Sequence, residues 1–165
     1  MAKTIIRVDD RLIHGQISVA WAQTLSTKEI IAIDDVTASN KMLQTIMLAG
    51  VSKAYNPKII TFEEAYEYLK KEIDGNRLVI VRSCENLEKL VDTVTNLSRI
   101  YIGNIQKTPH SKYNLSSGGG AVLYFADSDV EIIDRLVARG IDVVLQMVPS
   151  SGLRTWEQAK KQINK

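Results

Sequence analysis

Short runs of apolar, largely β-branched residues alternate with helical patterns along most of this 165-residue chain. The runs are continuous rather than interleaved with polar residues, which predicts strands that are buried on both faces. The predicted strands are TIIRV (4–8), EIIAID (29–34), KIITF (58–62), RLVIV (77–81), RIYIGN (99–104), AVLYF (121–125) and DVVLQMV (142–148). We therefore expect an α/β fold with a doubly wound, mostly parallel sheet of about six to seven strands and helices on both faces.

Helical patterns fill the intervals between these strands. The segments with helical character are 16–25, 39–50 and 155–164. Two capping-box patterns, Thr61 with Glu64 and Ser128 with Glu131, each predict the first turn of a further helix. Gly140 lies where a glycine that ends the second of these helices is expected.

Sheets of this kind bind ligands outside the carboxyl ends of their strands. In this sequence that edge is expected to contain residues 9–16, 34–37 and 82–85 and the loop after Asn104. No internal repeat and no linker interrupts the pattern, so the expected organisation is a single domain over 1–165.

The segment QKTPHSKYNLSSGGG (106–120) interrupts the alternation of strands and helices, because it is polar and glycine-rich and has no helical period. We expect either a long hairpin that leads into 121–125 as an antiparallel strand or a mobile flap. Its three consecutive glycines lack the Lys-Ser/Thr ending of a phosphate-binding P-loop. Its histidine, His110, is interpreted as a solvated loop residue, with contact to a ligand as the alternative.

Composition narrows the class of protein. The 21 Lys and Arg against 19 Asp and Glu give a net charge of +2, too balanced to indicate binding to nucleic acid or a membrane surface. No apolar stretch approaches the roughly 20 residues that cross a bilayer, and no signal-peptide pattern is present, so we expect a cytoplasmic protein. The single cysteine, Cys84, excludes an internal disulfide and is interpreted as a packed thiol or a thiol at the edge of the sheet, with a catalytic thiol as the alternative.

The segment VDDRLIHGQ (8–16) carries the candidate chemistry, because it places His14 directly before the predicted helix 16–25. The start of a helix offers free backbone N–H groups and the positive end of a dipole, and such sites bind phosphate readily. Arg11 adds a fork of donors shaped for phosphate oxygens. Arg7 would add a second positive charge if its side chain turns toward the same edge.

These charges favour the neutral imidazole of His14, which keeps a lone pair for nucleophilic attack, and stabilise an incoming phosphoryl group. A carboxylate from Asp9 or Asp10 can hold Arg11 or the other ring nitrogen in place. Gly15 lets a donor approach closely, because it has no Cβ. The segment fits a histidine that becomes phosphorylated, and on the residues alone a solvated loop cluster is the alternative.

Other chemistries lack their sequence patterns. No second His or Cys lies at the spacing of a zinc site, no G-x-S-x-G elbow marks a serine hydrolase, and no G-x-G-x-x-G marks a dinucleotide site.

The segment RVDDRLIHGQ (7–16) closely resembles the N-terminal signature of the enzyme IIB component of the mannose/fructose/sorbose family of the bacterial sugar phosphotransferase system. The resemblance extends along the chain through IDD (33–35), GNI (103–105) and LVARGIDVVLQMVP (136–149). The segment 106–120 departs from it, because it looks longer and more glycine-rich than the family pattern.

The resemblance implies a phosphotransferase with a phosphohistidine intermediate. His14 would accept a phosphoryl group, with Nδ1 as the linked nitrogen, from a phosphorylated IIA protein that is separate from this chain. It would then pass the group to a sugar entering through the membrane components IIC and IID, on which the protein would dock peripherally. Arg11 and Asp9 match the positions that arrange the site, while Gly15 and Gln16 match the backbone cradle for phosphate.

The resemblance implies no metal and no organic cofactor, and sugar recognition is expected to lie largely in the membrane components. Copies of the chain could pair through apolar helix surfaces. Two other functions stay open at this stage. One is a regulatory binding protein that uses the same phosphorylated His14 to control a regulator. The other is a small-molecule module that binds anions at the helix start without covalent chemistry.

Overall fold

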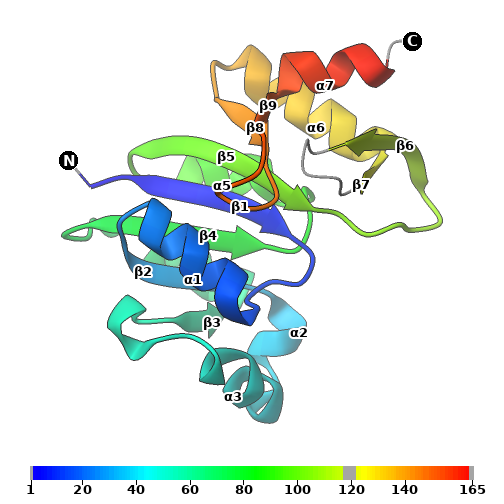
Figure 1. Cartoon of the computed structure of the whole chain (residues 1–165). Helices are drawn as coiled ribbons and strands as arrows, with labels where there is room; N and C mark the ends of the chain where they lie inside the picture. The colour runs from blue at the N-terminus through cyan, green and yellow to red at the C-terminus, as the bar shows by residue number, and fades with distance from the viewer. Residues whose placement is uncertain (1, 117–121, 164–165) are drawn as a thin grey trace.

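Seven strands form the central sheet, in the order β3-β2-β4-β1-β5-β8-β9 (Figure 1). The computed structural model describes residues 2–116 and 122–163, without the side chains of Gln16 and Ile17. The strands of the sheet are β1 (Thr4–Asp9), β2 (Thr27–Ile33), β3 (Lys58–Ile60), β4 (Asn76–Val81), β5 (Leu97–Asn104), β8 (Val143–Leu145) and β9 (Arg154–Thr155). Every neighbouring pair is parallel except β8 and β9. The predicted α/β fold with a mostly parallel sheet is confirmed.

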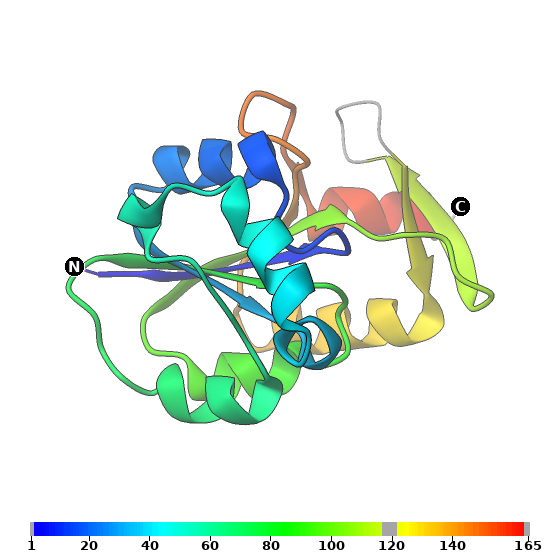
Figure 2. The ribbon, with the colours of Figure 1, turned by 90° about the horizontal axis from the view of Figure 1, so that it is seen from below.

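Helices cover both faces of this sheet (Figure 2). The helices are α1 (Gly15–Thr24), α2 (Asp35–Ala38), α3 (Lys41–Ala49), α4 (Phe62–Tyr68), α5 (Leu87–Thr93), α6 (Asp127–Ala138) and α7 (Trp156–Ile163), with a 3-10 turn, η1 (Lys53–Tyr55). The helix α1 lies on one face, and α4, α5 and α6 lie on the other. None of the helices in the described part of the chain has the length and apolar character needed to span a membrane.

The two faces have separate hydrophobic cores. On β1, Ile5 packs with Trp21 of α1, whereas Ile6 and Val8 pack with Leu87 of α5 and its neighbours. Successive side chains of a strand point to opposite faces, so a strand covered on both sides has apolar residues at consecutive positions. This explains the continuous apolar runs in the sequence.

The first capping box and the predicted glycine cap are confirmed. The backbone N–H of Glu64 donates to Oγ1 of Thr61 at 3.1 Å, so α4 begins where the pattern predicted. Gly140 follows α6 with φ of +85°, and its N–H donates to the carbonyl of Val137 at 2.9 Å. A glycine adopts this left-handed conformation at the end of a helix without a steric penalty.

The second capping box, Ser128 with Glu131, is wrong by two positions. The first residue of α6 is Asp127, and the residue before the helix is Ala126. The carboxylate of Asp129 accepts the backbone N–H of Ala126 at 2.9 Å, which is the contact expected of an acidic residue in the first turn. Three carboxylates lie close together in this sequence, so the helix could begin at more than one position. In the structure it begins where Asp129 accepts the N–H of Ala126.

The segment 106–120 supplies the first strand of a hairpin. Its strand β6 (Ser111–Ser116) pairs antiparallel with β7 (Val122–Ala126) in a two-stranded sheet of its own. This confirms the hairpin and the predicted antiparallel strand. Residues 117–121, with the three glycines, lie outside the described residues, and so does the tip of the predicted flap. The hairpin packs on α7, where the rings of Phe125 and Trp156 lie 5.7 Å apart.

Candidate functional site

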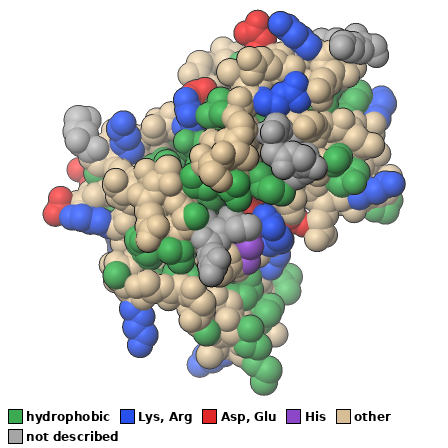
Figure 3. All heavy atoms as spheres, in the orientation of Figure 1, with side chains coloured by type: hydrophobic (Ala, Val, Ile, Leu, Met, Phe, Trp, Pro, Cys, Tyr) green, Lys and Arg blue, Asp and Glu red, His purple; other side chains and the backbone are tan. Residues whose placement is uncertain are grey.

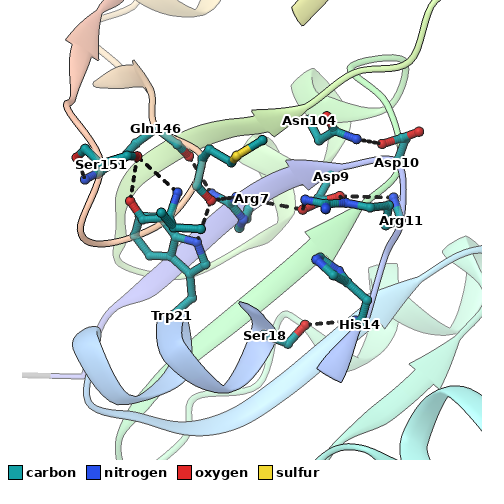
Figure 4. A network of polar contacts seen from close by, with 12 residues as sticks. Arg7, Asp9, Asp10, Arg11, His14, Ser18, Trp21, Asn104, Gln146 and Ser151 are labelled. Carbon is teal, nitrogen blue, oxygen red and sulfur yellow. Dashed lines mark hydrogen bonds and ion pairs between the residues drawn. The ribbon is translucent and has the colours of Figure 1, made fainter. Parts of the chain in front are cut away.

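The predicted site segments converge at the carboxyl ends of β1, β2, β4 and β5. Arg82, which follows β4, donates to the carbonyl of Asp10 after β1 and to the hydroxyl of Thr37 in α2. Asn104, the last residue of β5, donates to the carboxylate of Asp10. These hydrogen bonds bring the ends of the four strands together, and Figure 4 shows Asn104, Asp10 and His14 at this edge.

The loop between β1 and α1 has a fixed and unusual backbone. Leu12 has φ of +62°, uncommon for a branched residue, and its N–H donates to the carbonyl of Asp9 at 2.9 Å. The side chains of Leu12 and Ile13 are 1% and 2% exposed, so they anchor the loop in the core beneath α1. Gly15 has φ of +41°, and a Cβ added to it would meet nothing within 4 Å outside its chain neighbours and its own helix backbone. Its backbone conformation, rather than crowding, favours glycine there.

His14 immediately precedes α1 and is half-buried. Its backbone N–H donates to Oγ of Ser18 at 3.1 Å, and its ring points toward Asp9 and Arg11 (Figure 4). Both ring nitrogens are buried, and neither has a hydrogen-bond partner among the described residues. Burial lowers the pKa of His14, and the charges of Arg11 and Arg7 lower it further, against the opposing effect of Asp9. The imidazole is therefore neutral near pH 7 and has a free lone pair.

Asp9, and not Asp10, holds Arg11. The Asp9 side chain is 1% exposed, and its Oδ1 accepts the backbone N–H of Arg11 at 3.0 Å and Nε at 3.1 Å. Its Oδ2 accepts Nη2 of Arg11 at 3.2 Å. Within the described part of the chain, Nη1 of Arg11 has no partner, and the side chain is 34% exposed. Arg11 therefore offers one free charged donor beside His14.

Arg7 lies inside the fold and does not extend to the edge. Its Nη1 donates to the carbonyl of Gln146 at 2.9 Å, and its Nη2 donates to that of Met147 at 2.5 Å and lies 3.7 Å from Asp9. The guanidinium stacks 4.6 Å from the ring centre of Trp21. Burial lowers the pKa of Arg7 to about 10, which leaves it charged at neutral pH. Both terminal nitrogens donate to backbone carbonyls in this structure, and the expected contact of Arg7 with phosphate stays a prediction.

The second carboxylate of the motif points away from the ring of His14. Asp10 accepts a hydrogen bond from the side chain of Asn104, and its backbone N–H donates to the Asn104 carbonyl at 3.1 Å. Burial raises the pKa of Asp10, with a further increase from the nearby charge of Asp9. Arg82 donates to the Asp10 carbonyl at 2.5 Å. Sequence reasoning placed Arg82 in the edge region without assigning it a role.

The expected backbone cradle lies at the first residues of α1. Gly15 is its first residue and Gln16 its second. The first N–H groups of a helix have no partner within the helix, so they are available to an anion. The side chain of Gln16 lies outside the described residues.

The family of the chain is shown by a comparison of sequences. The sequence profile described as "PTS system sorbose subfamily IIB component" matches residues 3–165, which is nearly the whole chain. The chain belongs to this family. As a member of the sorbose-type IIB family, it is a component of a sugar phosphotransferase system, and the predicted resemblance is confirmed.

Individual relatives of this IIB protein are distant but cover most of its length. The N-acetylgalactosamine-specific phosphotransferase enzyme IIB component 1 of Escherichia coli is 26% identical over 88% of this chain and 90% of the relative. The crystal structure of that E. coli component has a TM-score of 0.80 and 25% identity, covering 92% of this chain and 97% of the other. The IIBSor domain of the sorbose permease from Klebsiella pneumoniae shares the fold, with a TM-score of 0.81, 20% identity and coverage of 99% and 97%.

Two other side chains of this IIB chain were candidates for chemistry. His110 is exposed in the loop before β6, where its backbone N–H donates to Oγ1 of Thr108 at 3.2 Å. This agrees with the prediction of a solvated loop residue. Cys84 is fully buried, and burial raises the pKa of its thiol well above the ordinary value. A buried, protonated thiol is a packing residue, as predicted, and a poor nucleophile.

Proposed function

We propose that this chain is the phosphocarrier of its sugar phosphotransferase system and works through a phosphohistidine at His14. One observation carries the proposal: the buried ring nitrogens of His14 have no partner among the described residues, and the pKa of the ring is lowered by burial. A neutral imidazole with a free lone pair is a nucleophile for phosphorus. The family assignment supports the same chemistry, because relatives are named phosphotransferase enzyme IIB components.

In the first step, the lone pair of Nδ1 of His14 attacks the phosphoryl group of a phosphorylated IIA protein. The N–P bond forms while the bond between phosphorus and the donor breaks, and the donor keeps that electron pair. Nη1 of Arg11 and the backbone N–H groups of Gly15 and Gln16 hold the phosphoryl oxygens. Asp9 fixes the direction of the Arg11 guanidinium.

In the second step, a sugar hydroxyl attacks the same phosphorus, the N–P bond breaks with its electron pair returning to Nδ1 of His14, and the hydroxyl proton is released to solvent. The acceptor is a sugar in the membrane components IIC and IID, with this chain docked on their cytoplasmic side. The chemistry uses no metal or organic cofactor, because arginine and backbone donors supply the positive charge. The burial of the ring nitrogens adds one requirement: the ring or its cover has to move before phosphorus can approach.

Exposed apolar side chains beside the site support docking of a protein donor. Val36 in α2 and Met42 and Ile46 in α3 are 75%, 75% and 65% exposed, and hydrophobic side chains gather over α3 in the space-filling view (Figure 3). The end of α3 adjoins the start of α1, since a Cβ added to Gly50 would lie 3.5 Å from Cα of Gly15. Exposed apolar patches of this kind mark protein interfaces. We assign this surface to the IIA protein.

The proposal is tested by incubating the protein with a phosphorylated IIA protein and measuring the intact mass. We expect one acid-labile phosphoryl group per chain, absent in His14→Ala and present in His110→Ala, which removes the chain's other histidine. Labelling that persists in His14→Ala would reject His14 as the acceptor. Reversible phosphate binding without a covalent adduct would instead favour an anion-binding module. Sugar phosphorylation in membranes with IIC and IID separates the carrier from a regulatory protein.

A further inference from the structure

Arg82 joins three segments that are distant in the sequence. It directly follows β4, and each nitrogen of its guanidinium has a different partner. Nη1 donates to the carbonyl of Asp10 at 2.5 Å, Nη2 donates to Oγ1 of Thr37 at 3.1 Å, and Nε lies 3.3 Å from Oδ2 of Asp34. The guanidinium thereby links the loop that carries His14 to the beginning of α2.

The partners of Arg82 on α2 are themselves fixed. Asp34 precedes α2 and accepts the backbone N–H of Thr37 at 3.0 Å and its hydroxyl at 2.5 Å. Thr37 is fully buried. Burial acts to raise the pKa of Asp34, but hydrogen bonds from Thr37 and Arg82 outweigh it and hold the pKa below its ordinary value. Asp34 therefore stays charged and offers Arg82 a rigid anchor.

The loop on the other side needs external support. Leu12 has φ of +62°, a conformation that a leucine adopts at a cost in free energy and keeps only when its surroundings enforce it. The residues around it are held at several points: Arg11 by Asp9, the Asp10 side chain by Asn104, and the Asp10 carbonyl by Arg82. Among the hydrogen bonds between described residues, those of Arg82 are the ones that link this loop to α2.

We propose that Arg82 is a positioning residue for phosphoryl transfer: by holding the Asp10 carbonyl against α2, it keeps the His14 loop in the conformation that reacts. The inference rests on the proposed function of His14 and assigns to Arg82 a role in that reaction. Among the described residues no hydrogen bond joins Arg82 to the ring of His14, and each of its three guanidinium nitrogens already has a partner. Its loss should therefore change the rate at saturating donor more than the donor concentration needed for half-saturation.

The test compares Arg82→Met and Arg82→Lys with a matched control, Arg99→Met. The side chains of Arg82 and Arg99 are 37% and 36% exposed, and each has a carboxylate partner, but Arg99 pairs with Asp142 away from the His14 loop. Arg82→Met removes all three contacts. Lysine keeps the charge but cannot bridge three partners with one ammonium group.

Two quantities are measured for each variant. Single-turnover transfer from phosphorylated IIA gives the maximal rate and the half-saturating donor concentration. Ring NMR signals of His14, recorded without donor, report its environment. We expect Arg82→Met to lower the maximal rate about tenfold, leave half-saturation within about twofold, and shift the His14 signals. Arg82→Lys should lower the maximal rate about threefold, and Arg99→Met should have the maximal rate of the wild type.

A rate for Arg82→Met equal to that of Arg99→Met, with unchanged His14 signals, would overturn the proposal. If Arg82→Met does not fold, Arg82→Lys provides the test. A wild-type maximal rate with unchanged His14 signals in Arg82→Lys rejects the positioning role of Arg82. A lower maximal rate with shifted His14 signals supports it. Phosphorylation of the wild-type chain tests the proposed function separately from the role of Arg82. A wild-type chain that takes no phosphate rejects the phosphocarrier, while the NMR comparison still reports whether Arg82 positions His14.

Discussion

The guanidinium of Arg11 meets the carboxylate of Asp9 at two points, with Nε 3.1 Å from Oδ1 and Nη2 3.2 Å from Oδ2. This fork-on-carboxylate geometry leaves Nη1 as the free donor and fixes its direction beside His14. Asp9 is almost completely buried and also lies 3.7 Å from Arg7, so one carboxylate balances two arginines. The charge at the site therefore depends on residues that lie partly inside the fold.

Replacing Arg11 by lysine tests the geometry of this donor separately from its charge. Arg11→Lys keeps the positive charge but cannot contact both Asp9 oxygens and a phosphoryl oxygen at once. We expect transfer from phosphorylated IIA to slow by about a hundredfold, comparable with the loss of one preorganised donor at a developing anion. The free energy of unfolding should change by at most about 1 kcal/mol, because the side chain is partly exposed.

The matched control for Arg11→Lys is Arg135→Lys. Arg135 makes a similar fork with Glu88 on the outer helices, through Nε at 3.1 Å and Nη2 at 2.7 Å. Its replacement should leave the transfer rate unchanged. Fast transfer in Arg11→Lys would show that the charge suffices. A large loss of stability with normal transfer would make Arg11 a structural tether.

The two carboxylates of the motif should differ sharply in their effect on stability. Asp9→Asn leaves the buried Arg7 without a charged partner and weakens the hold on Arg11, so we expect a loss of about 3–5 kcal/mol in unfolding free energy. Asp10→Asn keeps an oxygen that can accept from Asn104, and we expect a change within about 1 kcal/mol. Urea unfolding measures both. Equal losses in the two variants would contradict the assignment of Asp9 as the central counter-charge.

Gly103 controls the space that Arg7 occupies. A Cβ at Gly103 would lie 2.1 Å from Nη2 of Arg7 and 2.3 Å from its Cζ. The guanidinium cannot yield easily, because it is stacked on Trp21 and bound to backbone carbonyls. We expect Gly103→Ala to lower the unfolding free energy by about 1–3 kcal/mol and to slow transfer, since Arg7 and Asp9 would shift together.

Gly50→Ala provides the control for Gly103→Ala. Its added Cβ would meet Cα of Gly15 at 3.5 Å, an ordinary contact distance, so thermal unfolding and transfer should both stay near wild type. A Gly103→Ala protein as stable and active as Gly50→Ala would show that Arg7 can move without consequence.

Sequence reasoning predicted the sheet well because burial on both faces leaves a strong pattern in the residues. It missed the short elements α2, α5 and β9, which have four, seven and two residues. The helix α4 also has seven residues, but its capping box marked it in the sequence, whereas α5 has no side-chain cap. It also placed the start of α6 two residues late. Several residues near that start can accept the same backbone N–H, and the choice of Asp129 is made by packing.

For the site, the sequence predicted which residues lie close together but not which partners each side chain binds. The position of Arg7 on β1 places it on the same face as Ile5, beneath α1, yet nothing nearby in sequence indicates the carbonyls of Gln146 and Met147 as its partners. Those carbonyls reach Arg7 only because β8 follows β5 in the sheet order. The role of Arg82 depends in the same way on β4 lying between β1 and β2.

The lowered pKa of His14 predicts how transfer and stability depend on pH. The nucleophile is the neutral imidazole, so the rate at saturating donor should rise with pH through the folded-state pKa of His14 and then level off. Burial, assisted by Arg11 and Arg7, places that midpoint below the ordinary value of about 6.5. NMR titration of the ring should give the same midpoint, with His110→Gln used to assign the signals. A midpoint at or above about 6.5 in both measurements would contradict burial as the dominant effect.

The same pKa shift fixes the sign of the stability change. Because the unfolded chain binds a proton at His14 more readily than the folded chain does, acid favours unfolding. The contribution of the neutral ring is fully present above about pH 6.5 and is lost as the pH falls from there through the lower folded-state pKa. His14→Gln has no titrating group at this position. As the pH falls from about 6.5 through the folded-state pKa of His14, the unfolding free energy of the wild type should therefore decrease relative to that of the variant. Urea unfolding of both proteins at several pH values measures the difference. A pH-independent difference would mean that the ring of His14 titrates alike in the folded and unfolded chains, which would remove the electrostatic basis for a neutral nucleophile at this position.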